Sequence, residues 1–208
     1  KTITETPEVT AFAREMEDKF QKKYPDINIY LTGVVFMDNA FNEAGEGDMK
    51  SLIPVMYGIV LIIMALSLRT FWGTLTTILI MAFSILTGMG LAGWSGILLT
   101  PISANAPTII LTLAVADSIH ILVTLFYEMR HGKSKYEAIQ ESLRVNHQPV
   151  FITSITTAIG FLSLNFSDSP PFRDLGNIVA VGVMAAYFYS VYFLPAMMAV
   201  LPLRVKTV

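Results

Sequence analysis

The chain has 208 residues, of which 53% are hydrophobic and only 14% are charged, and its net charge is −2. Soluble domains carry about 25% charged residues, and 16 of the 30 charged side chains here lie in the first 50 residues, so the remainder has the composition of an integral membrane protein. This charge provides no basic surface for nucleic acid, and the absence of cysteine excludes disulfides, thiolate metal sites and cysteine nucleophiles.

The first fifty residues predict a small α+β segment outside the membrane. Apolar residues recur at helical spacing in 7–24, and Pro25 ends that pattern. Residues 27–35 alternate apolar and polar side chains, which predicts a strand, and residues 38–50 form a polar helix or loop before the membrane. About 50 residues are marginal for an independent core. We therefore interpret 1–50 as the C-terminal part of an extracytoplasmic domain and the chain as a fragment of a longer protein.

Five apolar segments follow, and each is near the ~20 residues that a helix needs to cross a bilayer. The predicted fold is therefore an all-α polytopic membrane protein, with a transmembrane domain over 51–203 and a short tail at 204–208. Residues 136–146 predict a short amphipathic helix along the cytoplasmic surface. The predicted spans are 51–68, 71–93, 106–127, 148–166 and 175–203.

The loops between the spans predict the orientation of the chain. If the N-terminal segment lies outside the cell, the outward loops contain only Arg173. The inward loops and the tail then contain Arg69, Arg130, Lys133, Lys135, Arg144, Arg204 and Lys206. Because cytoplasmic loops are enriched in Lys and Arg, we expect an extracytoplasmic N-terminal segment and a cytoplasmic tail.

Asp117 is the one acidic residue within the predicted spans, and it lies in the middle of 106–127. An ionisable side chain at membrane depth costs roughly 2.5–3.5 kcal/mol on insertion scales, and such a group usually faces a protein interior or a water path. His120 follows three residues later, on the same helical face. A carboxyl group beside an imidazole can take up and release a proton, so we predict a proton relay at Asp117 and His120. The alternative is a polar contact that only fixes helix packing.

Hydroxyl side chains of the fourth span are candidates for a path that brings protons to Asp117. They can equally hydrogen-bond to a neighbouring helix or to their own carbonyls. The span contains Thr153, Ser154, Thr156, Thr157 and Ser163. Our predicted path is Thr124 of the third span together with Thr153, Thr156 and Thr157.

Small residues in the fifth span predict close helix packing. Gly176 with Ala180, and Gly182 with Ala186, are small-xxx-small pairs. No group of residues has the spacing of metal ligands, and no glycine-rich phosphate loop is present. An intramembrane aspartyl protease would need a second acid in the membrane. The sequence therefore predicts no cofactor, no metal and no enzymatic activity.

Three segments resemble the resistance–nodulation–cell division (RND) superfamily, most closely the bacterial MMPL-type exporters related to the sterol-sensing domains of Patched-like proteins. They are LAVADSIHILV at 113–123, YEAIQESLRVNHQPV at 136–150, and the block from 153 to 183 that contains SDSPPFRD. The resemblance implies a repeat of one span, a large extracytoplasmic domain and five further spans, occurring twice. The aspartate of the family's G-x-x-x-D signature corresponds to Asp117, whereas the glycine position holds Leu113, a departure from the pattern.

By this resemblance the chain is the membrane part of a proton-driven exporter of lipids or other hydrophobic molecules, in a bacterial inner membrane. Implied partners are membrane lipids, a hydrophobic substrate and the remaining repeat of the same polypeptide, and a homo-oligomer stays open. The alternative function is a sterol- or lipid-sensing module that binds and regulates without pumping.

Overall fold

The structure is a computed structural model that describes residues 2–68 and 70–203, so the predicted tail at 204–208 lies outside the described residues. Every regular element among the described residues is helical. The chain divides into two compact units, Lys1–Gly58 and Ile59–Val208, and the division falls inside helix α3, Leu52–Leu68. The two units are described separately below.

The first unit contains two helices, α1 (Thr2–Lys23) and α2 (Val34–Lys50), which pack against each other. Arg14 of α1 donates two hydrogen bonds to the Glu43 carboxylate of α2, at 2.7 and 3.0 Å. Asn39 donates a third to the same carboxylate at 2.8 Å. Because the Arg14–Glu43 pair is exposed to solvent, it contributes little to stability.

The predicted strand at 27–35 is wrong. Residues 27–32 are irregular, and α2 begins at Val34. A strand needs a partner to accept and donate its backbone hydrogen bonds, and no strand occurs among the described residues. The Ile29 amide instead donates to the Gln21 side chain of α1 at 3.3 Å. Alternating side chains therefore did not suffice to specify a strand in this segment.

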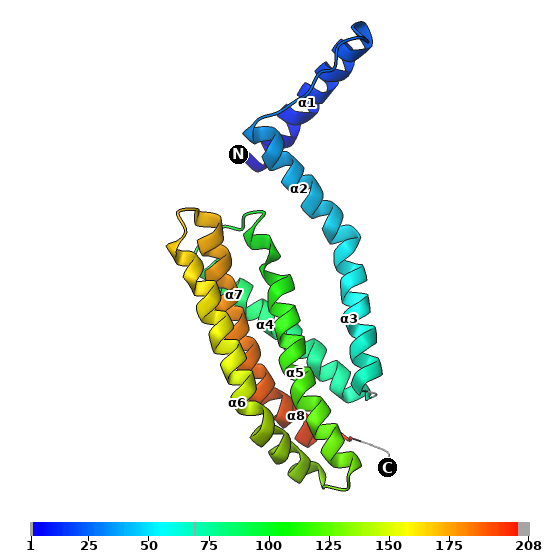
Figure 1. Cartoon of the computed structure of the whole chain (residues 1–208), viewed down its shortest axis with the longest axis vertical. Helices are drawn as coiled ribbons and strands as arrows, with labels where there is room; N and C mark the ends of the chain where they lie inside the picture. The colour runs from blue at the N-terminus through cyan, green and yellow to red at the C-terminus, as the bar shows by residue number, and fades with distance from the viewer. Residues whose placement is uncertain (1, 69, 204–208) are drawn as a thin grey trace. The chain divides into compact units, whose positions relative to one another are not determined.

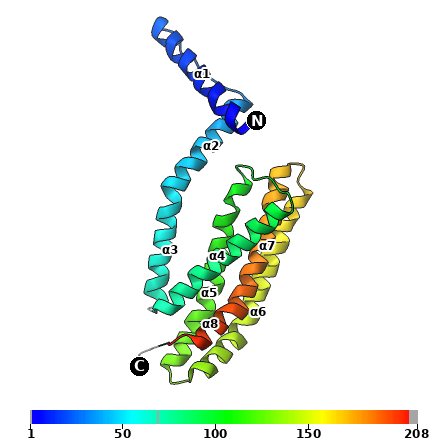
Figure 2. The ribbon, with the colours of Figure 1, turned by 180° about the vertical axis from the view of Figure 1, so that it is seen from behind.

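The second unit is a bundle of long apolar helices (Figures 1 and 2). Five helical stretches among the described residues are long and apolar enough to cross a membrane, which confirms the predicted all-helical, five-span membrane fold. The bundle contains α4 (Phe71–Trp94), η1 (Ser103–Asn105), α5 (Ala106–Arg130), α6 (Lys135–Leu162), η2 (Ser163–Phe166), α7 (Pro170–Phe188), the π-helical segment η3 (Tyr189–Phe193) and α8 (Leu194–Val200).

Helix α6 corrects the prediction of a separate surface helix at 136–146. It runs unbroken through Pro149, so that predicted helix and the following span are one element. Its start is fixed by a capping box, in which the Ser134 hydroxyl accepts from the Glu137 amide and the Glu137 carboxylate accepts from the Ser134 amide. At about 1.5 Å per residue its 28 residues extend about 42 Å, well beyond a hydrocarbon core of about 30 Å.

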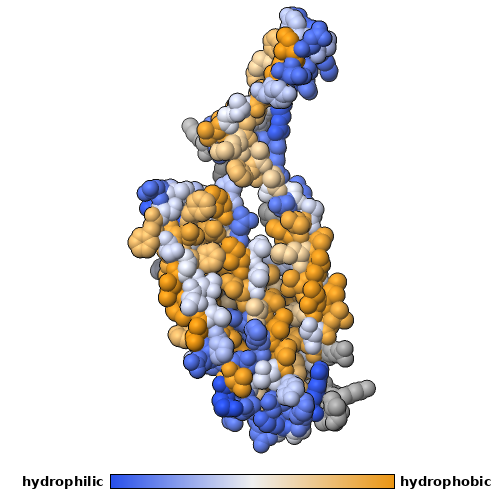
Figure 3. Space-filling view, in the orientation of Figure 1, coloured by the Kyte–Doolittle hydropathy of each residue, from blue (hydrophilic) through white to orange (hydrophobic). Residues whose placement is uncertain are grey.

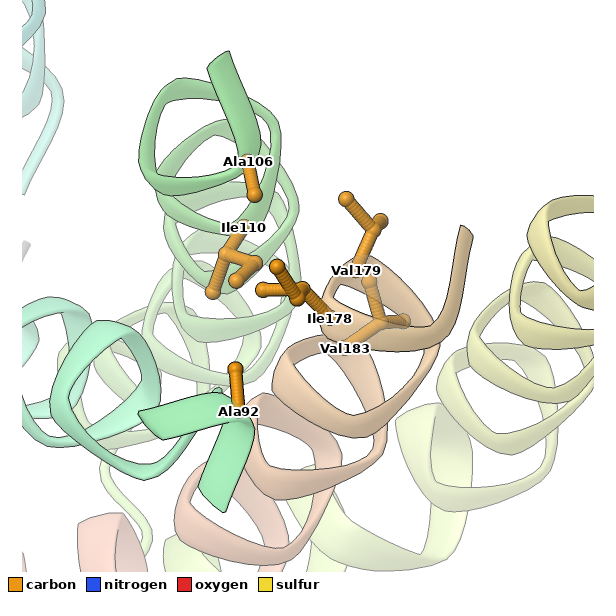
Figure 4. Packing of buried hydrophobic residues seen from close by; sticks show 6 residues of the cluster. All are labelled: Ala92, Ala106, Ile110, Ile178, Val179 and Val183. Atoms are coloured by element: carbon orange, nitrogen blue, oxygen red, sulfur yellow. The ribbon is translucent and has the colours of Figure 1, made fainter. Parts of the chain in front are cut away.

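A close-packed apolar cluster lies between α4, α5 and α7 (Figure 4). Lipid tails are as apolar as leucine, so helices in a bilayer associate through close packing rather than through the hydrophobic effect. Ile110 of α5 lies between the other two helices and is fully buried. The cluster consists of Ala92, Ala106, Ile110, Ile178, Val179 and Val183.

Two glycines of α7 lie where a Cβ atom would collide with a neighbouring helix. At Gly182 an added Cβ would lie far inside van der Waals contact of Ile110. At Gly176 it would meet the backbone carbonyl oxygen of Phe161 in α6. Ala180 and Ala186, the other members of the predicted pairs, are 4% and 0% exposed. These four small residues thus all lie in the interior of the bundle.

Charged side chains gather at the end of the bundle where α5 connects to α6, which we call the α5–α6 end (residues 128–144 and the end of α8). Figure 3 shows this end in blue below the largely orange lateral surface of the bundle. Lys135, at the start of α6, donates to the backbone carbonyls of Ala199 and Leu201. This contact caps the last turn of α8 with a cation, as the helix dipole favours.

Candidate functional site

Asp117 is buried between α5 and α6, with a side chain that is 6% exposed. Ser154 of α6 donates a hydrogen bond from its hydroxyl to Asp117 Oδ2 at 3.2 Å. Ser154 belongs to a buried row on α6 that recurs every fourth residue, from Ala138 to Ala158. This spacing turns one face of α6 towards α5, and that face delivers the hydroxyl to the carboxylate.

No cation offsets the charge of this carboxylate in the part of the chain that the structure describes. No Lys, Arg or His nitrogen among those residues lies within 4.0 Å of Asp117. Taking an unpaired carboxylate out of water costs several kcal/mol. Keeping Asp117 negatively charged is therefore costly unless a cation or water reaches the site. Binding a proton removes this cost, because it neutralises the carboxylate.

Two further polar contacts connect α5 to α6 on the side of Asp117 nearer the α5–α6 end. The Ser142 hydroxyl donates to the Ile121 backbone carbonyl. The Asn146 amide donates to the Thr124 hydroxyl at 2.8 Å, and Thr124 itself donates to the His120 carbonyl at 3.1 Å. Thr124, which we placed on the proton path from sequence, thus contacts Asn146.

His120 forms no hydrogen bond or ion pair with Asp117 among the residues that the structure describes. The aspartate is buried, whereas His120 is exposed on the outer surface of α5. Three residues correspond to about 300° around a helix, so the two side chains diverge by about 60°. At this angle Asp117 points into the interface with α6, whereas His120 is exposed at the surface of α5. The relay between Asp117 and His120 stays a prediction.

The predicted threonines of α6 form no hydrogen bond with Asp117 among the described residues. Thr153 and Thr156 are exposed, and each donates to carbonyls of its own helix. Thr157 is half-buried. Ser154, which we had named among the hydroxyls of this span but left out of the predicted path, is the one that contacts the carboxylate. Ser154 is singled out by the four-residue burial period of α6, which the structure reveals.

A second buried hydroxyl contact lies next to Asp117 and was missed. The Ser118 and Ser190 side chains are both fully buried and their hydroxyl oxygens lie 3.4 Å apart. Ser190 belongs to the π-helical segment η3, which directly precedes Leu194-Pro195. Proline has no N–H to donate to the preceding turn, so Pro195 is the sequence signal for this irregularity. Such π-helical turns are common at functional sites.

Ser154→Ala should weaken the contact between α5 and α6, because it removes the side-chain donor to Asp117. Interhelical hydrogen bonds in membranes average about 0.6 kcal/mol and reach about 1.7 kcal/mol. We expect a loss of that order in the free energy of unfolding of the full-length protein, measured by denaturation in mixed micelles. Ser163→Ala is the matched control, because that hydroxyl bonds only to the Gly160 carbonyl. Equal losses in both variants would contradict a specific role for Ser154.

The MMPL family model matches residues 4–206 of this chain. The chain belongs to the MMPL family. Because the match covers both units and all five candidate spans, we describe the protein as an integral membrane protein of the RND/MMPL type.

Curated relatives agree with the MMPL assignment. The chain is 24% identical over 176 residues to "Putative membrane protein MJ1562" of Methanocaldococcus jannaschii, a match that covers 85% of this chain and 45% of that protein. It is 24% identical over 178 residues to "Probable transport protein MmpL12" of Mycobacterium tuberculosis, covering 83% of this chain and 15% of that protein. The chain therefore spans less than half the length of either MMPL relative.

Proposed function

We propose that this MMPL chain is the membrane-spanning part of a proton-driven transporter that exports lipids or other hydrophobic molecules. Family membership and the name of MmpL12 support transport rather than enzymatic catalysis. The observation that carries the proton-coupled proposal is Asp117, a 6%-exposed acid in a long apolar helix. Its side chain has one hydroxyl donor and no cation partner among the residues that the structure describes.

In the proposed mechanism, Asp117 binds a proton from one side of the membrane and releases it to the other. Protonation removes the charge, and with it the cost of keeping that charge away from water. The balance between helix arrangements then changes, because a carboxylate and a carboxylic acid differ in what they require of Ser154 and of nearby water. His120 is exposed on the surface of α5, where it can contact another part of the complete protein.

Dependence on a pH gradient separates this proposal from a lipid-sensing module. The full-length protein in liposomes, with a fluorescent lipid as probe, should move lipid when a pH gradient is imposed and stop when a protonophore collapses it. A sensor would bind the lipid equally well with and without the gradient and would not move it. Binding without gradient-dependent movement would thus favour the sensing module and contradict the pump.

The remaining assignments of place and partners are part of the same proposal. We place the protein in a bacterial inner membrane, with its N-terminal segment outside and its C-terminal end in the cytoplasm, because Lys and Arg concentrate at the α5–α6 end. We propose that a hydrophobic substrate, membrane lipids and a second repeat of the same polypeptide are its partners. Cysteine-accessibility labelling of Lys133→Cys should succeed only from the cytoplasmic side.

A further inference from the structure

A groove of about 520 Å³ lies between α6 and η3, towards the α5–α6 end of the bundle. Four residues on one face of α6 form one wall, and two residues of η3 form the other. Hydrogen-bond donors and apolar side chains both contribute, so the groove is amphipathic. Its lining is Leu143, Arg144, His147, Gln148, Val191 and Tyr192.

Arg144 provides the groove with a guanidinium whose charge is paired with Glu141 but whose N–H donors are only partly used. Its Nε donates to Glu141 at 3.0 Å and its Nη2 donates to the other carboxylate oxygen. A guanidinium has five N–H donors, and Nη1 has no partner among residues 2–68 and 70–203. Among the described residues no acidic side chain lines this groove. Arg144 also borders the neighbouring hollow of about 540 Å³ beside the α5–α6 loop, which Glu137 and Glu141 line. The α6–η3 groove can therefore offer an anion the free Nη1 donors of Arg144 with no carboxylate in its own lining.

His147 is held in place by a buried tyrosine. The Tyr187 hydroxyl lies 2.9 Å from His147 Nε2, and Tyr187 is only 5% exposed. When the hydroxyl donates to Nε2, the ring proton of a neutral imidazole is on Nδ1. That second nitrogen then offers a donor whose direction is fixed by the Tyr187 contact. Arg144 and His147 lie three residues apart on α6 and line the same groove, so their donors can reach one ligand.

From the length of α6 and the position of its charges, we place the groove at the depth of lipid headgroups. Helix α6 exceeds the hydrocarbon thickness by about 12 Å, at about 1.5 Å per residue. Its charged residues, from Lys135 to Arg144, all fall in its first three turns, so the membrane boundary falls near Arg144 and Gln148. Tyr192, 64% exposed, lies at the same level, where tyrosine is enriched in membrane proteins. Val191 and Leu143 then provide apolar contacts for an acyl chain.

We propose that this groove binds an anionic phospholipid of the cytoplasmic leaflet, with Arg144, His147 and Gln148 contacting the phosphate and Leu143 and Val191 contacting the lipid chain. Basic pockets between membrane helices are suited to such headgroups. The proposal is independent of proton coupling at Asp117, because binding needs no pH gradient.

The test counts lipids bound to the full-length protein by native mass spectrometry, after reconstitution in phosphatidylcholine nanodiscs with increasing fractions of phosphatidylglycerol. Wild type should retain phosphatidylglycerol in preference to phosphatidylcholine. Arg144→Gln should weaken that retention about fivefold, which is the effect of about one basic residue near an anionic surface. Tyr187→Phe keeps the ring and Arg144 but releases His147, and should also weaken it, which provides a second reading if Arg144→Gln impairs folding.

Arg130→Gln is the matched control, because it removes one charge from the α5–α6 end without touching the groove. The proposal predicts unchanged retention in this variant. Equal losses in Arg130→Gln and Arg144→Gln would overturn it by showing a general charge effect. The proposal would also be overturned if wild type retained phosphatidylcholine as well as phosphatidylglycerol, or if millimolar inorganic phosphate displaced the phosphatidylglycerol. None of these outcomes bears on whether Asp117 carries protons.

Discussion

Asp117→Asn should abolish gradient-driven lipid movement in the full-length protein while leaving its expression and folding intact. Asparagine has nearly the shape of a protonated aspartic acid, and its amide oxygen can still accept from Ser154, which lies 3.2 Å from the carboxylate in the wild-type chain. The substitution also removes the cost of burying a charge. What it removes for function is the exchangeable proton. Lipid flux in proteoliposomes should fall to the level of protein-free liposomes.

Asp168→Asn is the control for this experiment, since it makes the same chemical change at an exposed residue between η2 and α7. It should transport like wild type. If Asp117→Asn kept flux that depended on the pH gradient, Asp117 would have no part in the mechanism. Loss of expression in Asp117→Asn but not in Asp168→Asn would instead assign Asp117 a structural role, which contradicts the proposed one.

Gly176→Ala should destabilise the bundle strongly, because the new methyl group would collide with the backbone carbonyl oxygen of Phe161. A backbone atom cannot turn aside as a flexible side chain can, so α6 and α7 would have to separate. Overpacking of this kind costs about 1–3 kcal/mol. We expect a loss of that size in the free energy of unfolding, measured by denaturation of the full-length protein in mixed micelles.

Gly160→Ala is the comparison, because it lies one residue before Phe161 on α6 and a Cβ there meets nothing within 4 Å. Alanine favours helix over glycine by roughly 0.5–1 kcal/mol, so this variant should be as stable as wild type or slightly more stable. Destabilisation of both variants by the same amount would show that glycine flexibility, not close packing, determines stability here.

Sequence patterns predicted the membrane helices well, because length and apolar composition alone determine whether a segment can cross a bilayer. The predicted second span, 71–93, compares with α4 at Phe71–Trp94, and the third, 106–127, with α5 at Ala106–Arg130. The prediction of a strand at 27–35 was wrong because strand formation depends on a partner strand, which the local pattern does not reveal. The prediction of a separate surface helix at 136–146 was wrong because α6 continues through Pro149 as one helix.

The candidate site was predictable only in part. A sequence shows which residue carries a charge within an apolar span, but not which side chains lie beside it in the folded bundle. Asp117 is conspicuous because charge in an apolar span is rare. Its contact with Ser154 depends on the rotation of α6 against α5, which is set by packing along the whole interface. The exposed position of His120 depends on the same rotation. Ser118 and Ser190 come together through a π-helical turn that no simple period predicts.

Infrared difference spectroscopy of the full-length protein in lipid tests most directly whether Asp117 is a switchable buried acid. Spectra recorded on lowering the pH should show the carbonyl band of a carboxylic acid that forms in wild type. The same band should be missing in Asp117→Asn and displaced in Ser154→Ala, where its hydrogen-bond donor is gone. An identical difference spectrum in wild type and Asp117→Asn would show that Asp117 does not change its protonation, and would contradict the proposed proton coupling.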